Sequence, residues 1–181
     1  MVIVITGDVG VGKTTVCRKL IAIARNRGYA CGGILTDKAL DKGIIIEDIE
    51  SGETERLASV EDIYDGPRTP KYHFNPDGIR FGIRAIERAV SATILVVDEI
   101  GYLELGGEGF TRVLELIEAG GVRNCVIVIR SELLAAFMVW LPTALVFNAT
   151  IDNREQLPDE IGSVLLKGLE GSKVARAGRV K

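Results

Sequence analysis

A glycine-rich segment near the N-terminus has the residue types and spacing of a phosphate-binding loop. In GDVGVGKTT, which starts at Gly7, the pattern G-x-x-x-x-G-K-[ST] is completed by Gly12, Lys13 and Thr14. A short apolar run precedes the segment and a predicted helix follows it, which is the context that this pattern requires. Glycines let the backbone fold back until successive N–H groups converge on phosphate oxygens, and the helix N-terminus adds partial positive charge. The sequence therefore predicts a nucleotide-phosphate site.

Each residue of this loop has a predicted role. The lysine of the pattern reaches the β- and γ-phosphates, and the hydroxyl that follows it ligates Mg²⁺. We therefore expect Lys13 to be catalytic and Thr14 to bind the metal. The whole loop is expected to bind the nucleotide: Gly7, Asp8, Val9, Gly10, Val11, Gly12, Lys13, Thr14 and Thr15.

Two adjacent carboxylates end an apolar run in the middle of the chain. In VVDEIGYLEL they are Asp98 and Glu99, and burying two like charges without a partner is costly. Because the carboxyl ends of the strands in such a sheet line the ligand crevice, a cation there can offset the repulsion. We predict that Asp98 holds the Mg²⁺ bound by Thr14. We predict that Glu99 is catalytic and orients or deprotonates a water facing the γ-phosphate, and a kinase could use it in the same way.

An arginine often stabilises the transition-state charge on the γ-phosphate. Arg154 is the first candidate and Arg130, at the end of a predicted strand, is the second; Arg80 and Arg84 are further candidates. The guanine-selective N-K-x-D motif is absent, because TIDN at residues 150–153 lacks the lysine. Strict GTP specificity is therefore not expected.

Four other side chains leave alternatives open. Glu104 is either an acid that positions Glu99 or a water, or a surface carboxylate in a turn. His73 is the only histidine, and one histidine does not build a metal site. Together with Tyr72 and Phe74 it could instead stack on a nucleotide base.

Hydrophobic patterning predicts strands that alternate with helices. Strands are expected at residues 2–5, 29–36, 43–49, 53–59, 94–97, 125–129 and 144–147, and helices at 14–27, 77–91, 108–119, 131–141 and 153–167. The dipeptide Ser51-Gly52 predicts a hairpin between two of these strands, and the proline-containing residues 65–76 predict a loop. We therefore predict an α/β fold, with a mostly parallel sheet, helices on both faces and one added antiparallel hairpin.

Composition limits the class of protein and its surroundings. The chain of 181 residues is 47% apolar and 26% charged, which predicts one globular domain, expected at residues 1–168, followed by a flexible basic tail at 169–181. A net charge of −3 argues against a nucleic-acid surface. The sequence shows neither a signal peptide nor a membrane span. Three cysteines without CxxC spacing predict reduced core residues, so the cytoplasm is the expected location.

Nine consecutive apolar residues, LLAAFMVWL, run from Leu133 to Leu141. On one helix they would cover every face, whereas a helix on a sheet buries only one stripe. We therefore predict an exposed patch of Phe137, Met138 and Trp140, used for self-association or for a protein partner. The alternative is a helix buried beneath the C-terminal helix or tail.

With these residues in place, the sequence resembles the thermostable nucleoside-triphosphate phosphatase family, which includes the cancer-related nucleoside triphosphatase. The most specific match is DEIGYLEL, at residues 98–105, which is similar to the family's DEIG-x-(M/L)-E-L signature. The other matching stretches are GDVGVGKTT, GGILTDKAL at residues 32–40 and FNATIDNREQLPDEI at residues 147–161. The resemblance covers about residues 1–167 but is poor over residues 125–141.

The resemblance implies a P-loop NTPase fold of the RecA-like kind and hydrolysis of nucleoside triphosphates with Mg²⁺. It implies roles for Lys13, Thr14, Asp98, Glu99 and Glu104, and it places Asn153 and Arg154 near the nucleotide. It also implies that one strand separates the P-loop strand from the strand that carries Asp98. Two other functions remain open: a kinase for a nucleotide or small metabolite, with its acceptor held by residues 65–76, and a nucleotide-gated binding module.

Overall fold

The computed structural model describes the backbone of residues 1–177 and the side chains of residues 1–169. The strands are β1 (Val2–Thr6), β2 (Cys31–Lys38), β3 (Ile44–Asp48), β4 (Thr54–Ser59), β5 (His73–Phe74), β6 (Ile94–Ile100), β7 (Cys125–Ile129) and β8 (Leu145–Asn148). The helices are α1 (Lys13–Asn26), α2 (Pro76–Arg88), α3 (Tyr102–Leu105), α4 (Arg112–Glu118), α5 (Leu134–Phe137) and α6 (Leu157–Ala177), with short 3₁₀ turns η1 (Ala89–Ser91) and η2 (Ser131–Leu133).

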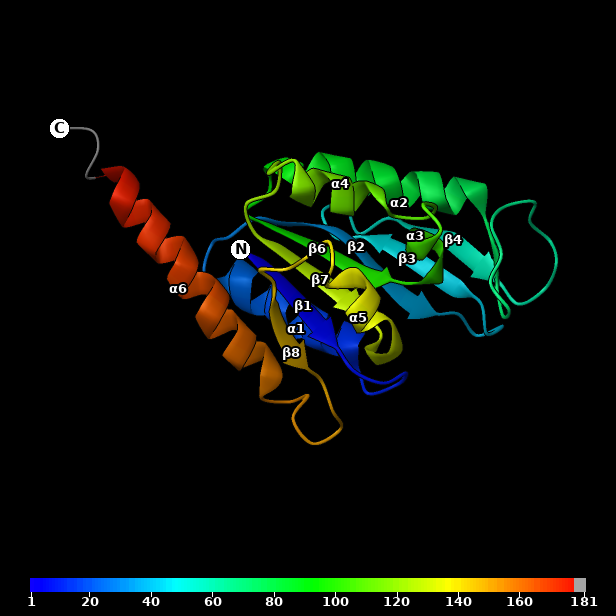
Figure 1. Ribbon diagram of the computed structural model, residues 1–181, viewed down its shortest axis with the longest axis horizontal. Helices are drawn as coiled ribbons and strands as arrows, with labels where there is room; N and C mark the ends of the chain where they lie inside the picture. Colours follow the sequence, from blue (N-terminus) through cyan, green and yellow to red (C-terminus); the bar gives the residue numbers. More distant parts are fainter. Residues whose placement is uncertain (178–181) are drawn as a thin grey trace.

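All of these strands form one sheet, in the order β5-β4-β3-β2-β6-β7-β1-β8. Pairing is parallel from β2 through β6, β7 and β1 to β8, and antiparallel from β2 through β3 and β4 to β5. The mostly parallel sheet and the β3–β4 hairpin are therefore as predicted. The strand expected between the P-loop strand and the Asp98 strand is β7 (Figure 1).

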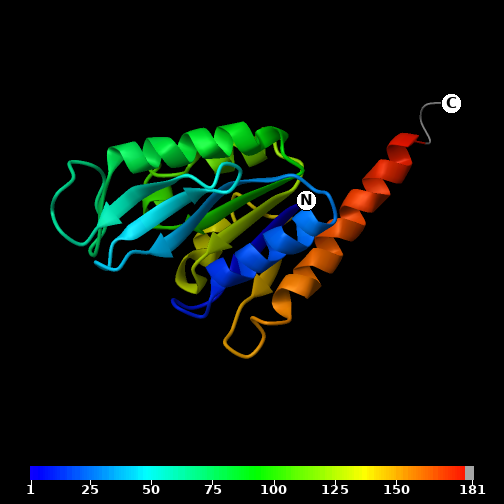
Figure 2. The same ribbon diagram turned by 180° about the vertical axis from the view of Figure 1, so that it is seen from behind.

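Helices cover both faces of the sheet, as predicted. Helices α1 and α6 lie side by side on one face, and α2 and α4 lie on the other (Figures 1 and 2). The parallel strands β1, β6 and β7 are apolar along almost their whole length because both of their faces are buried. Side chains of neighbouring residues alternate between two core clusters, with Ile94 and Val96 toward α1 and Leu95 and Val97 toward α2.

Helix α2 lies unusually close to the antiparallel part of the sheet. A Cβ atom on Gly78 would lie 2.3 Å from the backbone carbonyl oxygen of Arg56 in β4. One turn further along, a Cβ on Gly82 would lie 2.5 Å from the Phe110 ring and 2.6 Å from the side chain of Ile46. Glycine at both positions therefore lets the helix pack directly on the hairpin.

The predicted helix over residues 131–141 is wrong. The segment is a 3₁₀ turn followed by one helical turn, and it then runs as a non-helical turn into Pro142, which disfavours a helical residue before it. Phe137 is fully buried in the core, together with Leu133 and Leu141, so it is not part of an exposed patch. Trp140 is 47% exposed. A role for this surface in association stays a prediction.

Other element boundaries also differ from the predictions. The predicted strand at 94–97 continues through Ile100, so Asp98 and Glu99 lie within β6. The predicted helix at 108–119 begins only at Arg112, and the short helix α3 before it was not predicted. Helix α6 runs to Ala177, past its predicted end at residue 167 and into the predicted tail; residues 178–181 lie outside the described part of the chain. None of the helices described here has the combined length and apolar character that a membrane crossing needs.

The close approach of α2 predicts opposite effects of the same substitution at two helical glycines. Gly78→Ala should lower the free energy of unfolding by about 1–3 kcal/mol, because the added methyl group meets backbone atoms. Gly162→Ala in α6 should leave it unchanged or raise it by up to about 1 kcal/mol, because its Cβ has ordinary contacts, the nearest at 3.4 Å, and alanine favours the helix. Urea denaturation of both variants tests this, and equal changes would contradict it.

Candidate active site

The phosphate-binding loop and the Asp98 strand meet at the carboxyl ends of the parallel strands. The loop leaves β1 at Gly7, where a Cβ would lie 2.3 Å from the carbonyl oxygen of Ala149, and α1 starts directly after it. The Thr14 hydroxyl donates a hydrogen bond to Asp98 Oδ2 at 2.6 Å, across 84 residues of sequence. The structure thus brings together the two residues that were predicted to share a metal.

The two adjacent acids contact different residues. Asp98 follows Ile94 and Val96 in the alternation of β6, and its carboxylate contacts the start of α1. Glu99 instead pairs with Arg130, which directly follows β7. The two carboxylates therefore have different partners, at a point where the register between β6 and β7 is irregular.

The Lys13 side chain binds the backbone of its own loop. Its Nζ donates hydrogen bonds to the carbonyl oxygens of Gly7 at 2.7 Å and Asp8 at 2.8 Å. Burial lowers the pKa of Lys13, and the charges of Glu99 and Asp98 partly offset this. An ammonium whose hydrogen bonds go to neutral carbonyl oxygens can exchange them for stronger ones to a phosphate anion.

Asp98 is a buried carboxylate, 2% exposed. Besides Thr14, its Oδ2 accepts a longer hydrogen bond from the backbone N–H of Thr36 at 3.4 Å. The pKa of Asp98 is raised to about 7, because burial raises it and the hydrogen bond from Thr14 offsets only part of that rise. The ionised carboxylate is thus poorly compensated, which is the setting that a bound cation relieves.

The donor set fits Mg²⁺. Within the described residues, no cluster of three or more His, Cys, Asp or Glu side chains could hold a metal by itself. Mg²⁺ is commonly bound by one or two carboxylates together with water and substrate phosphates. Thr14 and Asp98 are the residues that would hold it.

Two of the candidate arginines lie near the loop. Arg130 donates from its Nε to Glu99 Oε1; burial lowers the pKa of Arg130, but the hydrogen bond and the charge of Glu99 raise it overall. Arg154 lies over the turn of the loop, since a Cβ on Gly12 would be 3.4 Å from its Cδ. Arg80 is exposed and pairs with Asp77 on α2.

Asn153 has a structural role next to Arg154. Its side-chain oxygen accepts from the backbone N–H of Thr150 at 2.8 Å, and its amide donates to the carbonyl of Asn148 at 2.8 Å. These bonds hold the loop between β8 and α6, which carries the arginine. No prediction from the sequence had given Asn153 this bracing role.

The loop, the acids and Arg130 line one cavity of about 350 Å³, which we call the phosphate cavity. Sequence reasoning missed four of its polar residues: Thr36, Asp37 and Lys38 on β2, and Lys71 in the 65–76 loop. Thr36 lies within GGILTDKAL, where Gly33 lets β2 approach β6: a Cβ there would be 2.1 Å from the carbonyl oxygen of Val96. That glycine was the available signal. No local pattern marked Lys71.

Glu104 is not the surface carboxylate that one of the two predictions gave, and a role in positioning a water stays a prediction. It is 6% exposed, and its two carboxylate oxygens accept from the backbone N–H groups of Gly101 and Phe110, both at 2.7 Å. Burial raises the pKa of Glu104, and these two hydrogen bonds lower it in part. The carboxylate braces the loop between β6 and α4 and does not contact Glu99.

The aromatic segment of the 65–76 loop is not an exposed stacking surface. Tyr72 is buried and meets Phe74 edge to face, with ring centroids 6.4 Å apart. His73 pairs in β5, and its Nδ1 lies 3.0 Å from Asp62 Oδ1. The suggestion that these three side chains together stack on a base is therefore wrong.

The sequence matches the NTPase family over residues 2–162. The nucleoside-triphosphatase THEP1 of Methanopyrus kandleri is 31% identical over 175 residues, covering 93% of this chain and 97% of that protein. The nucleoside-triphosphatase THEP1 of Methanocaldococcus jannaschii is 32% identical over 185 residues, covering 94% of this chain and all of that protein.

Two solved structures share the fold. THEP1 from the hyperthermophile Aquifex aeolicus has a TM-score of 0.75 at 27% identity, covering 91% of this chain and 99% of that one. A human cancer-related nucleoside triphosphatase has a TM-score of 0.70 at 23% identity, covering 90% of this chain and 96% of that one. With the loop, the paired acids and the sheet order in place, the chain therefore belongs to the NTPase family of P-loop enzymes.

Proposed function

We propose that this chain hydrolyses nucleoside 5′-triphosphates, ATP and GTP among them, to the diphosphate and phosphate, with Mg²⁺ as cofactor. The observation that carries the proposal is the convergence of Lys13, the Thr14–Asp98 pair and Glu99 on one phosphate cavity. The names of the relatives, nucleoside-triphosphatase THEP1, support the same activity.

The chain's own groups account for binding and for the proton transfer. The backbone N–H groups of the loop and the start of α1 receive the phosphates, and Lys13 leaves its carbonyl partners to bind the terminal ones. Glu99 accepts the proton of the attacking water, and the ion pair with Arg130 holds the Glu99 carboxylate in place. When bound at Thr14 and Asp98, Mg²⁺ would neutralise charge on the phosphate oxygens.

Arg154 is proposed to stabilise the charge that develops on the transferring phosphate. Its position over Gly12 supports this role, because the guanidinium can reach phosphate oxygens held by the loop. We also propose the cytoplasm as the site of action. The three cysteines support a reducing compartment, since Cys17, Cys31 and Cys125 are free and buried.

Removing the proton acceptor and removing the phosphate lysine should have different effects. Glu99→Gln should bind Mg–ATP with nearly unchanged affinity and lower turnover by roughly 10²–10⁴-fold, because the general base is lost while the phosphate contacts of the loop stay. Lys13→Ala should weaken both binding and turnover, because Lys13 contacts phosphate in the ground state and in the transition state. Calorimetric titration and phosphate release measure the two effects, with Glu160→Gln on α6 as a control. Wild-type turnover in Glu99→Gln would refute its role.

Asp98→Asn should weaken Mg²⁺-dependent nucleotide binding without lowering the stability of the fold. The folded protein raises the pKa of this carboxyl from 3.8 to about 7, so the ionised form costs stability as the pH rises through this range. At pH 8 the neutral amide should therefore melt at the same or a higher temperature, while Mg²⁺-dependent ATP binding falls by roughly tenfold or more. A variant that melts earlier yet keeps Mg²⁺-dependent binding contradicts the assignment.

Base selectivity should be broad. The identified contacts face phosphate, and the N-K-x-D motif is absent. ATP and GTP should therefore turn over at rates within about tenfold of each other, a difference of about 1.4 kcal/mol in activation free energy. Initial rates across a panel of ribonucleotides and deoxyribonucleotides measure this. A preference of a thousandfold for one base would exclude it.

A further inference from the structure

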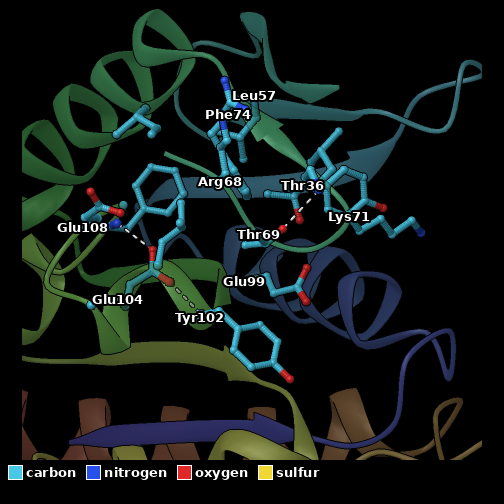
Figure 3. Close-up of a pocket in the computed structure, with 18 of the residues that line it drawn as sticks. Thr36, Leu57, Arg68, Thr69, Lys71, Phe74, Glu99, Tyr102, Glu104 and Glu108 are labelled. Carbon is cyan, nitrogen blue, oxygen red and sulfur yellow. Dashed lines mark hydrogen bonds between the residues drawn. The ribbon is translucent and has the colours of Figure 1, made fainter. Parts of the chain in front are cut away.

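A second cavity, larger than the first, also has Glu99 in its wall (Figure 3). We call it the apolar cavity; its volume is about 550 Å³, within the range of small-molecule sites. Most of its wall surface is apolar, and the apolar side chains come from the hairpin, β5, α2 and the segment around α3: Leu57, Phe74, Ile79, Leu103 and Phe110.

The two cavities meet beside Glu99, next to the expected position of the terminal phosphate. Glu99 and Arg130 line both of them, and so do Lys71 and Tyr72. Hydrolysis needs room at Glu99 for one water, whose share of liquid volume is about 30 Å³. The apolar cavity is more than tenfold larger than this, and an apolar wall gives a single water little to bind. The space therefore fits a second molecule better than it fits the nucleophilic water alone.

Hydrogen bonds of the buried Glu104 fix one part of the cavity wall. The carboxylate of Glu104 bridges Gly101 and Phe110, as described above, and Gly109 packs against it with φ +61°. A Cβ on Gly109 would lie 2.1 Å from Glu104 Oε1. A buried, twice hydrogen-bonded carboxylate of this kind makes the segment that carries Leu103 and Phe110 rigid. This part of the cavity wall is therefore preformed.

The charges around the cavity favour a neutral occupant. Arg68 is held by Asp62, with a contact of 3.1 Å, and Arg130 is held by Glu99. Lys71 lies at the shared mouth, with its ammonium 4.9 Å from the centre of the Tyr72 ring. The charged side chains of the wall balance one another, since Arg68, Lys71 and Arg130 are positive and Glu99, Glu104 and Glu108 are negative. The wall therefore carries no net charge that would select an anion or a cation.

We propose that the apolar cavity binds a second substrate: a neutral compound with a ring-sized apolar body and a primary hydroxyl directed at Glu99. This inference rests on the proposed nucleotide site and deepens it. The hydroxyl oxygen forms a bond to the γ-phosphorus while the bond from that phosphorus to the β–γ bridging oxygen breaks. The hydroxyl proton passes to Glu99, and the products are the nucleoside diphosphate and a phosphate monoester. Release of free phosphate is then the outcome when water replaces the alcohol.

The test measures ADP and free phosphate separately, with Mg–ATP and a series of ring-bearing primary alcohols: benzyl alcohol, 2-phenylethanol, thymidine and adenosine. Without alcohol, one phosphate should appear for each ADP. With at least one of these alcohols, the ratio of phosphate to ADP should fall below one, and the missing phosphate should be found as the monoester by phosphorus NMR.

Variants that fill the cavity test whether the lowered ratio of phosphate to ADP depends on binding in this cavity. Ile79→Phe, from α2, and Leu103→Phe, from α3, each reduce the space, and two variants from different elements guard against misfolding of one. Each should return the ratio to one. Ile83→Phe is the matched control, because Ile83 is half-buried one turn further along α2 but does not line the cavity. It should keep the lowered ratio.

The outcomes separate this inference from the proposed function. If no ADP forms under any condition, the proposed hydrolysis itself fails. If ADP and phosphate stay equal with every alcohol, the hydrolase proposal stands and the second-substrate site is overturned. A ratio that falls equally in the wild type and in both filling variants also overturns it, because the alcohol would then act outside the apolar cavity.

Discussion

The hydrogen bond between Thr14 and Asp98 joins the two parts of the site, the phosphate-binding loop with α1 and the strand β6 that carries the acids. The positions of the other site residues depend on this contact. It ties the first residues of α1 to β6, across 84 residues of sequence. Asp98 is nearly inaccessible to water, and burial raises its pKa. A carboxylate in this position is costly without a positive partner. The fold bears this cost because β1, β7 and β6 lie side by side and are packed on both faces, which brings the helix that follows β1 next to Asp98.

The two neighbouring acids of β6 contact different parts of the site. Asp98 accepts a hydrogen bond from Thr14 in the first turn of α1, whereas Glu99 pairs with Arg130 and lines the apolar cavity. The antiparallel strands that distinguish this sheet from a purely parallel one supply much of that cavity's wall, since Ile44 and Leu57 come from β3 and β4. Helix α2 completes the wall and can do so because Gly78 lets it lie directly on β4. The added hairpin is therefore part of the site.

Local sequence patterns predicted the features that depend on neighbouring residues. The phosphate-binding loop, the continuous apolar strands and the hairpin were all predicted, because their spacing reflects backbone geometry within a few residues. Prediction failed where contacts between distant residues decide the structure. LLAAFMVWL suggested one exposed helix, but Phe137 is drawn into the core and Pro142 ends the segment. Glu104 suggested a surface or auxiliary acid, but it binds two backbone amides that only the folded loop brings together.

The sequence by itself determined the chemistry at the phosphate end of the site. Glycines, a lysine and a hydroxyl at fixed spacing specify a backbone cradle for phosphate, whatever surrounds it. Only the tertiary structure decided what Glu99 faces. Its ion pair with Arg130 joins residues 31 positions apart, and the apolar cavity beyond it is assembled from β3, β4, α2, α3 and the loop before α2. A cavity is the space left by the packing of distant elements, and no short stretch of sequence carries that information.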